Sequence, residues 1–398
     1  MSRILQGIRV LDLSRHVAAP YCGLLLADMG AEVIRVDDPK GDDDRKIGYP
    51  SPIEDGYVYL ARGRNKKGIT VNLSSERGRD IFGRLLEVSD VVLESYTIGA
   101  MEALGVDYQS LRRINPSIIL VSITAFGING PYASRPGFDL VAQAYCGAMS
   151  MTGFPGNPPT ASRVGWVDYS TGTHAALGAV SALYHRAQTG VGQMVEVSLL
   201  DTAFNLMMLH WYPGEYKVLG IEHEQRGNRG PTWAYGDLFK TKDGWVFFFM
   251  GGRQSLWRRF VKAIGREDLE NKPGFRTDWE RGHNAEALDQ IISEWIDDKT
   301  ADDVIRLMEE ARVPCAKVLS VAEAVNDPQV KTRATTLDIE YPGVGSIPAP
   351  GVLIKFSETP GKIDRPAPKL GEHNEEVYCG LLGLRKEDVE ELTKSGVI

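Results

Sequence analysis

The first 125 residues alternate between two hydrophobic patterns, and this alternation constrains the fold more than any other feature of the sequence. Short apolar runs typical of buried strands are separated by stretches with helical spacing. Strands that alternate with helices form parallel sheets covered by helices. We therefore expect an α/β fold with a Rossmann-like large domain. The predicted strands are residues 8–13, 32–36, 69–73, 90–93 and 118–123, and the predicted helices are residues 21–29, 76–88 and 108–114.

The middle of the chain departs from this pattern. Residues 138–150 and 171–186 are apolar on nearly all faces, which predicts buried helices. Residues 211–231 are rich in aromatic, charged and glycine residues and are typical of a crossing segment. The domains we expect are a large one formed by residues 1–210 and 326–398, a linker at 211–224, and a smaller α+β domain at 225–325.

Composition excludes several classes of protein. The 398 residues include 53 acidic and 45 basic side chains, and a net charge of −8 disfavours a nucleic-acid partner. Four scattered cysteines without a Cys-x-x-Cys pair argue against a disulfide scaffold and a structural zinc. No apolar run approaches the ~20 residues that cross a bilayer, and no signal-type region follows the start. We expect a cytoplasmic protein without a membrane partner.

The common cofactor motifs are missing. Asp37 closes the second predicted strand, where a ribose-binding acid would lie, yet the loop Ser14-Arg-His-Val-Ala-Ala-Pro20 lacks Gly-x-Gly-x-x-Gly. We therefore expect neither a nicotinamide nor a flavin cofactor. The sequence has no P-loop and no Gly-x-Ser-x-Gly elbow, and its seven histidines form no metal-type pair. No metal site is expected.

Asp168 lies just before the second apolar helix, in Gly165-Trp-Val-Asp-Tyr-Ser-Thr-Gly172. One interpretation is structural, because an acidic side chain interacts favourably with a helix N-terminus. The other is functional, because an ionised carboxylate can attack as a nucleophile without a general base. Local pattern leaves both interpretations open.

Two other segments are candidates for binding. Arg62-Gly-Arg-Asn-Lys-Lys67 is the densest basic cluster, and it is either a solvated face or a phosphate site beside the sheet. Gly251 and Gly252 directly follow a predicted strand, where they form either a turn or a mobile cover whose N–H groups face an anionic intermediate.

Taken together, these motifs make the whole chain resemble the family III CoA-transferases, which include formyl-CoA and carnitine CoA-transferases. No single motif is decisive, but their number and order are typical of the family. The motifs that carry the resemblance are residues 7–12, 27–34, 65–67, 126–131, 152–159, 168–172, 313–319 and 367–373.

The resemblance implies that coenzyme A is a substrate and that Asp168 is the nucleophile. Its carboxylate would form a mixed anhydride with the acyl group of a donor acyl-CoA such as succinyl-CoA, and then an aspartyl-CoA thioester that a free carboxylic acid resolves. Gly251 and Gly252 match the family's mobile glycine loop. The family also implies an interlocked homodimer. The CoA contacts carry over to Val17, Ala18, Asn65, Lys66, Lys67, Ser95, Tyr96, Thr124, Ala125 and Phe126.

The chain departs from the family at several positions. Asp38 and Ala103 stand where formyl-CoA transferase has arginines that bind the nucleotide, so Arg64, Arg45 or Lys40 are the candidate substitutes. Related racemases of 2-methylacyl-CoA carry a catalytic histidine where this chain has Phe138. A racemase is therefore one alternative function, and a non-catalytic subunit of a hetero-oligomeric transferase is another.

The acceptor acid is the least constrained part of the prediction. Aromatic residues crowd the crossing segment, which suggests an apolar or aromatic acyl group, although they could equally pack between domains. A dicarboxylate such as succinate follows from the family alone. The aromatic residues concerned are Trp211, Tyr212, Tyr216, Trp233 and Tyr235.

Overall fold

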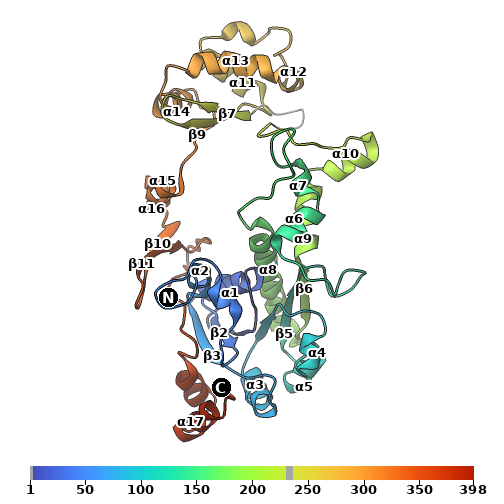
Figure 1. Cartoon of the computed structure of the whole chain (residues 1–398), viewed down its shortest axis with the longest axis vertical. Helices are drawn as coiled ribbons and strands as arrows, with labels where there is room; N and C mark the ends of the chain where they lie inside the picture. The colour runs from blue at the N-terminus through green and yellow to red at the C-terminus, as the bar shows by residue number, and fades with distance from the viewer. Residues whose placement is uncertain (1–2, 230–235) are drawn as a thin grey trace. The chain divides into compact units, whose positions relative to one another are not determined.

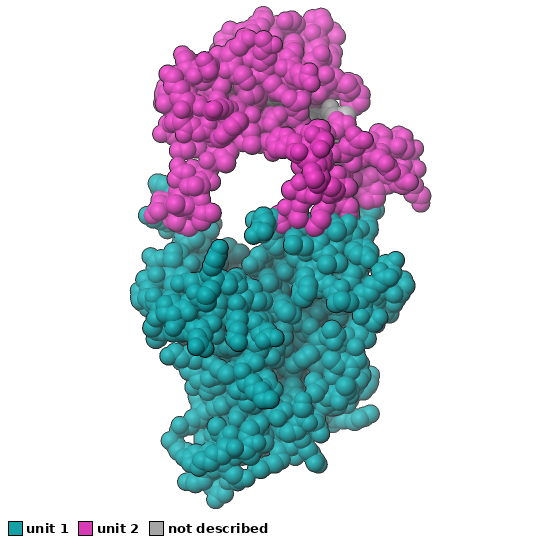
Figure 2. All heavy atoms as spheres, viewed as in Figure 1, with its two compact units in different colours: residues 1–146, 163–210, 327–398 teal, residues 147–162, 211–326 magenta. Residues whose placement is uncertain are grey.

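The computed structural model describes residues 3–229 and 236–398, so Trp233 and Tyr235 lie outside the described residues. The chain divides into two compact units, which Figure 2 colours separately. The first unit consists of residues 1–146, 163–210 and 327–398, and the second of residues 147–162 and 211–326.

A six-stranded parallel sheet forms the centre of the first unit (Figure 1). Its strand order is β3-β2-β1-β4-β5-β6, the order of a doubly wound sheet. The expected α/β class is confirmed. The strands are β1 (Arg9–Asp12), β2 (Glu32–Asp37), β3 (Lys66–Thr70), β4 (Val91–Glu94), β5 (Ile119–Thr124) and β6 (Met194–Ser198).

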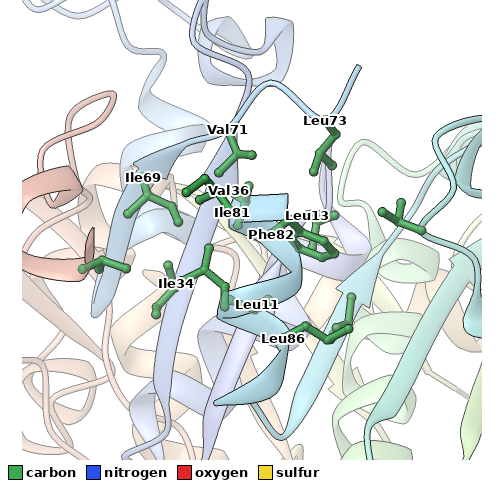
Figure 3. Close-up of a cluster of buried hydrophobic side chains, with 14 of the residues drawn as sticks. Leu11, Leu13, Ile34, Val36, Ile69, Val71, Leu73, Ile81, Phe82 and Leu86 are labelled. Carbon is green, nitrogen blue, oxygen red and sulfur yellow. The ribbon is translucent and has the colours of Figure 1, made fainter. Parts of the chain in front are cut away.

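Alternate residues of a strand point to opposite faces of the sheet. Helices cover these faces and bury their apolar side chains. Leu11 and Ile34 pack with Phe82 of α3 in one hydrophobic cluster (Figure 3). The C-terminal residues Val397 and Ile398 complete that cluster. The helices of the first unit are α1 (Ala18–Asp28), α2 (Tyr57–Gly63), α3 (Glu76–Glu87), α4 (Ala100–Ala103), α5 (Tyr108–Ile114), α6 (Asp139–Tyr145), α8 (Trp166–Thr189), α9 (Leu199–Leu209), α16 (Pro328–Thr332) and α17 (Lys386–Lys394).

Strand β3 begins three residues earlier than predicted, at Lys66 instead of Ile69. The register is set by β2, where Val33 lies opposite Lys66 and Asp37 opposite Thr70. The hydrophobic pattern missed this start because Lys66 is polar yet buried, and its ammonium forms an ion pair with Asp12 inside the protein.

Helix α8 also begins earlier than predicted, at Trp166, so Asp168 lies within its first turn and not before it. The helix ends at Thr189, where Gly190 adopts a left-handed conformation with φ of 75°. It packs closely against α1 at Gly172. A Cβ at that position would lie 2.4 Å from the carbonyl oxygen of Ala18, so only glycine permits this approach.

The predicted helix over 138–150 is two helices, α6 and α7 (Ala148–Met151), because Gly147 between them has a φ of 86°. Residues 147–162 then belong to the second unit and not to the large domain as predicted. Hydrogen bonds explain the association, since Gln225 Nε2 donates to the carbonyl oxygens of Thr152 and Pro158 at 2.9 and 3.0 Å.

The second unit has its own core, in which Trp257 and Phe260 stack beneath a three-stranded antiparallel sheet. The predicted linker 211–224 contains a helix, α10 (Tyr212–Leu219), and belongs to this unit. The remaining elements of the unit are β7 (Gly236–Lys240), β8 (Trp245–Phe249), α11 (Gln254–Ala263), α12 (Asp278–His283), α13 (Ala285–Ile296), α14 (Ala301–Glu310), β9 (Cys315–Lys317) and α15 (Val321–Asn326).

The C-terminal segment returns to the first unit. A hairpin of β10 (Thr336–Tyr341) and β11 (Gly345–Pro350) packs against α2, where Tyr341 donates a hydrogen bond to the carbonyl oxygen of Leu60. The carbonyl oxygen of Pro368 then accepts hydrogen bonds from Arg45 and Tyr59. None of the described helices is long and apolar enough to cross a membrane.

Candidate active site

A pocket opens at the carboxyl edge of the parallel sheet. It encloses about 780 Å³ of space continuous with solvent and is lined by the loops that follow β1, β4 and β5. Parallel strands present the loops at their carboxyl ends along one edge, which is where doubly wound sheets bind ligands.

The pocket brings together most of the residues predicted to bind CoA. One of the predicted contacts, Phe126, is absent from the lining, and its ring packs against Tyr132 and Tyr145. The predicted nucleophile enters the pocket from the first turn of α8. The predicted residues that line it are Val17, Ala18, Ser95, Tyr96, Thr124, Ala125 and Asp168.

Asn65, Lys66 and Lys67 do not lie at this pocket, because residues at the start of a parallel strand lie at the opposite edge of the sheet. The buried Lys66 Nζ lies 2.7 Å from Asp12 Oδ2 and 2.8 Å from the carbonyl oxygen of Pro20. Lys67 is bound by Glu32 and Glu376. Both cations are therefore paired with carboxylates within the chain, and neither lines the pocket that Asp168 lines.

The Asp168 carboxyl group is mostly buried, and burial is the main cause that raises its pKa to about 7. The negative charge of Asp139 raises the pKa further, and the positive charge of Arg62 opposes that rise. In the described part of the chain, the Asp168 carboxylate accepts no hydrogen bond. The carboxyl group therefore lines the pocket without a hydrogen-bond donor from the described residues.

Asp139 organises the start of α8. Its Oδ2 accepts the backbone N–H of Asp168 at 2.9 Å, and its Oδ1 accepts a hydrogen bond from Gln143 at 2.5 Å. The first N–H groups of a helix lack partners inside the helix, and Asp139 supplies one from a neighbouring helix. Sequence analysis missed this residue because nothing in the local pattern links residue 139 to residue 168.

Two further pocket residues, His16 and Arg135, were not predicted. His16 has a backbone φ of 66°, and its ring meets that of Phe138 edge to face with centroids 5.0 Å apart. Arg135 lies 3.9 Å above the ring of Tyr132 and donates a hydrogen bond to Tyr145 at 3.0 Å. The only available signal was their position after predicted strands.

Comparison with known proteins decides the family. The sequence signature described as CoA-transferase family III matches residues 5–374. The chain belongs to family III of the CoA-transferases. It is therefore an enzyme that moves CoA between an acyl-CoA and a carboxylic acid.

Relatives match along nearly the full length of this transferase. A succinyl-CoA–D-citramalate CoA-transferase of Chloroflexus aurantiacus is 35% identical over 397 residues, covering 100% of this chain and 98% of that protein. The beta subunit of a succinyl-CoA–L-malate CoA-transferase from the same organism is 33% identical, covering 99% and 98%. A crystal structure of a CAIB/BAIF family protein from Brucella suis is 32% identical, with a TM-score of 0.84, and covers 96% of this chain and 100% of that one.

Two of the arginines named as candidate nucleotide ligands are already paired with carboxylates of the protein. Arg64 Nη2 lies 2.6 Å from Asp28, and Arg45 pairs with Asp37 and Asp55 at 3.1 and 2.8 Å. Both side chains are buried. They stabilise the first unit and are not available to a phosphate.

The glycine pair lies in the second unit, directly after β8. Gly252 has a φ of 83°, which favours glycine, and its N–H donates to Asp278 Oδ2 at 2.8 Å. A role of Gly251 and Gly252 at the site stays a prediction. Among the described residues, no group of three or more His, Cys, Asp or Glu side chains is arranged to hold a metal ion.

Proposed function

We propose that this transferase works through covalent intermediates on Asp168. The observation that carries the proposal is a carboxylate that lines the pocket without a hydrogen-bond partner among the described residues. A carboxylate attacks a thioester without a general base, so the reaction needs no catalytic histidine.

The steps balance in atoms and charge. The Asp168 carboxylate attacks the donor thioester carbonyl, which gives an aspartyl anhydride and CoA thiolate. The thiolate then attacks the aspartyl carbonyl, which releases the donor acid and leaves an aspartyl-CoA thioester. The acceptor carboxylate repeats the two steps in reverse order, and the product acyl-CoA departs with Asp168 restored.

The environment of Asp168 suits this chemistry. Burial removes water from the attacking oxygen, and interactions of the nucleotide and pantetheine with the protein offset the cost of forming the anhydride. Asp139 fixes the first turn of α8, which orients the attacking carboxylate.

The loops after β1, β4 and β5 are the proposed binding surface for CoA. Arg135 is the proposed cation for an anionic part of this substrate, because it is exposed at the pocket and two aromatic side chains hold it in place. Gly251 and Gly252 are the proposed cover over the acyl intermediates, because their flexible backbone can change conformation at low cost.

We further propose succinyl-CoA as the donor and a dicarboxylic acid as the acceptor. Support comes from the names of the two relatives described above, both of which use succinyl-CoA. The alternative of an aromatic acyl group has less support, because neither of these relatives is named for an aromatic acid.

A dimer is part of the same proposal. Helix α8 was predicted to be buried, yet Leu177 and Tyr184 on it are 64% and 68% exposed. Leu209 at the end of α9, in the same unit, is also exposed. Exposed apolar side chains on these two helices support an interface. An interlocked homodimer fits it, and a hetero-oligomer is the alternative that a relative named as a subunit brings in.

The experiment is an exchange screen in which several acyl-CoA donors are mixed with mono- and dicarboxylic acids and the products are read by mass spectrometry. Wild-type protein should transfer CoA from succinyl-CoA, and hydroxylamine should trap an adduct on Asp168. Asp168→Ala should abolish both signals. If Asp168→Ala retained wild-type transfer, the covalent mechanism would be wrong. Light scattering during size-exclusion chromatography tests the dimer.

A further inference from the structure

The second residue of the glycine pair is held by a carboxylate of its own unit. The N–H of Gly252 donates to Asp278 Oδ2 at 2.8 Å. Among the described residues, the backbone of residues 251–253 donates no other hydrogen bond. A Cβ at Gly252 would meet no described atom within 4 Å, so close packing does not fix the φ of 83°. The Asp278 carboxylate is therefore the contact that holds Gly252 in the conformation observed.

Asp278 is fixed in turn by a buried arginine. Asp278 is the first residue of α12, and its Oδ1 pairs with Arg281 one turn further along that helix. The two oxygens of the carboxylate thus have separate partners, Arg281 on one and Gly252 on the other. A charged acceptor forms a stronger hydrogen bond than a neutral one, so the bond to Gly252 gains from the charge of Asp278.

Arg281 connects this contact to the core of the second unit. Its side chain is 1% exposed, and its guanidinium carbon lies 4.8 Å from the centre of the Trp257 ring. Its Nη1 donates to the carbonyl oxygen of Phe275 at 2.8 Å, and both Nη atoms lie near Gln254 Oε1, at 3.3 and 3.4 Å. Gln254 is the first residue of α11, two positions after Gly252. Arg281 therefore fixes the chain directly after the glycine pair as well.

We propose that Asp278 and Arg281 are positioning residues of the transfer reaction, which hold the glycine pair in place so that it keeps water from the acyl intermediates. The inference rests on the proposed roles of Asp168 and of the glycine pair. Arg281 orients Asp278, Asp278 orients Gly252, and neither side chain contacts the substrate.

A flexible cover needs such a contact because water competes with the acceptor acid. Water that reaches the aspartyl-CoA thioester adds to its carbonyl carbon, and the carbon–sulfur bond breaks. The products are the Asp168 carboxylate, the free CoA thiol and a proton, so the donor is consumed and no new acyl-CoA forms. One hydrogen bond to a charged acceptor orders the cover and can still break when substrates enter and products leave.

Amide hydrogen exchange tests the contact without turnover. Asp278→Asn has the shape of aspartate but only one acceptor oxygen, which cannot serve both Arg281 and Gly252. The Gly252 amide is observed by NMR in protein labelled with ¹⁵N-glycine and assigned as the signal that Gly252→Ala removes. It should exchange about tenfold or more faster in Asp278→Asn than in wild type. An equal exchange rate would overturn the inference.

Glu280→Gln is the matched control. Glu280 lies on the same helix, and its Oε2 accepts the backbone N–H groups of Gly274 and Arg276, each at 2.9 Å. The change removes one negative charge from α12 and weakens two contacts to backbone, but it leaves the N–H of Gly252 bound. Exchange at Gly252 should therefore equal that of wild type.

Product analysis tests the role in the reaction. Wild-type protein, Asp278→Asn, Arg281→Met and Glu280→Gln are incubated with succinyl-CoA and a dicarboxylic acid, and mass spectrometry measures free CoA and the new acyl-CoA. The hydrolysed fraction of the donor should rise about tenfold or more in Asp278→Asn and Arg281→Met and stay at the wild-type value in Glu280→Gln. An unchanged fraction in Asp278→Asn despite faster exchange would show that the contact is only structural and overturn the inference.

Two further measurements keep the outcomes distinct. Arg281→Met also loses the bond to Phe275, so its Tm should fall. Asp278 has a side chain that is 23% exposed, so Asp278→Asn should stay folded and decides the result if Arg281→Met unfolds. Transfer that survives in Asp168→Ala would overturn the covalent mechanism alone, because exchange at Gly252 does not depend on Asp168.

Discussion

Asp139 Oδ2 accepts the backbone N–H of Asp168 at 2.9 Å, so one acidic side chain fixes the helical turn that presents another to the pocket. The same contact brings two negative charges together, which raises the pKa of Asp168. The contact therefore fixes the orientation of Asp168 and disfavours ionisation of its carboxyl group.

Replacing Asp139 by Asn should separate these two effects. Asn keeps an oxygen that can accept the N–H but removes the charge, so the pKa of Asp168 should fall and the acidic limb of kcat/KM should move to lower pH. Asp139→Ala is the control, because it also removes the cap and should cost about 1 kcal/mol of stability. If the acidic limb of the kcat/KM profile did not move in Asp139→Asn, Asp139 would act only as a cap of α8.

Stability should depend on pH through Asp168. Its pKa is raised from 3.8 to about 7 by folding, so the folded state binds more protons than the unfolded state between these values. Stability should therefore fall as the pH rises from about 4 to 7, by up to about 4 kcal/mol. Asp168→Asn should remove this fall and be more stable than wild type at pH 8. Denaturant unfolding across this pH range measures both.

Gly172→Ala should disturb the contact between α8 and α1. The added Cβ would lie 2.4 Å from the backbone carbonyl oxygen of Ala18, so the helices must separate at a cost of about 1–3 kcal/mol. Transfer should also fall, because Ala18 and Asp168 both line the pocket. Gly83→Ala on α3 is the control. Its Cβ would lie 3.6 Å from Ile114, so this change should leave the protein as stable or more so.

Lys66→Met should act on folding and not on CoA affinity. The change leaves the Asp12 carboxylate buried without its cation, which should cost about 3–5 kcal/mol. Lys67→Met, at a partly exposed pair, should cost about 1 kcal/mol or less. Urea unfolding measures the difference. A Lys66 variant of normal stability with a raised KM for acyl-CoA would restore the prediction that Lys66 binds the substrate.

Arg135→Gln should weaken binding of acyl-CoA. Loss of one charge-assisted contact should raise the KM about tenfold or more and reduce its dependence on salt. Arg113→Gln, on the exposed surface of α5, is the matched control and should change neither quantity. An unchanged KM in Arg135→Gln would remove this residue from the proposed CoA surface.

The sequence predicted the strands well where the buried residues are apolar, and poorly where a charged residue is buried. Strand β1 and helix α3 follow their hydrophobic patterns closely. Lys66 is charged yet buried, so the hydrophobic pattern does not reveal that β3 begins there. Only the position of Asp12 across the sheet explains why the lysine can be buried, and no local pattern contains that information.

The candidate site was predictable where it depends on chain direction. Val17, Ser95 and Thr124, which the family resemblance implies as CoA contacts, follow three parallel strands and line one pocket, because loops after parallel strands converge. Their contact with CoA stays a prediction. Asp139 was not assigned to the site, because its contact with Asp168 spans 29 positions along the chain. This contact comes from folding and not from any motif.

The C-terminal segment returns to the first unit, so that unit can complete its folding only after this segment has been synthesised. Asn72 donates its backbone N–H to the carbonyl oxygen of Val397, and Arg45 and Tyr59 bind the carbonyl oxygen of Pro368. A ribosome that has made all six strands of the sheet must still complete about two hundred residues before these partners exist. The nascent first unit stays open for that time, so a stop codon near the end removes part of its core and not merely a tail.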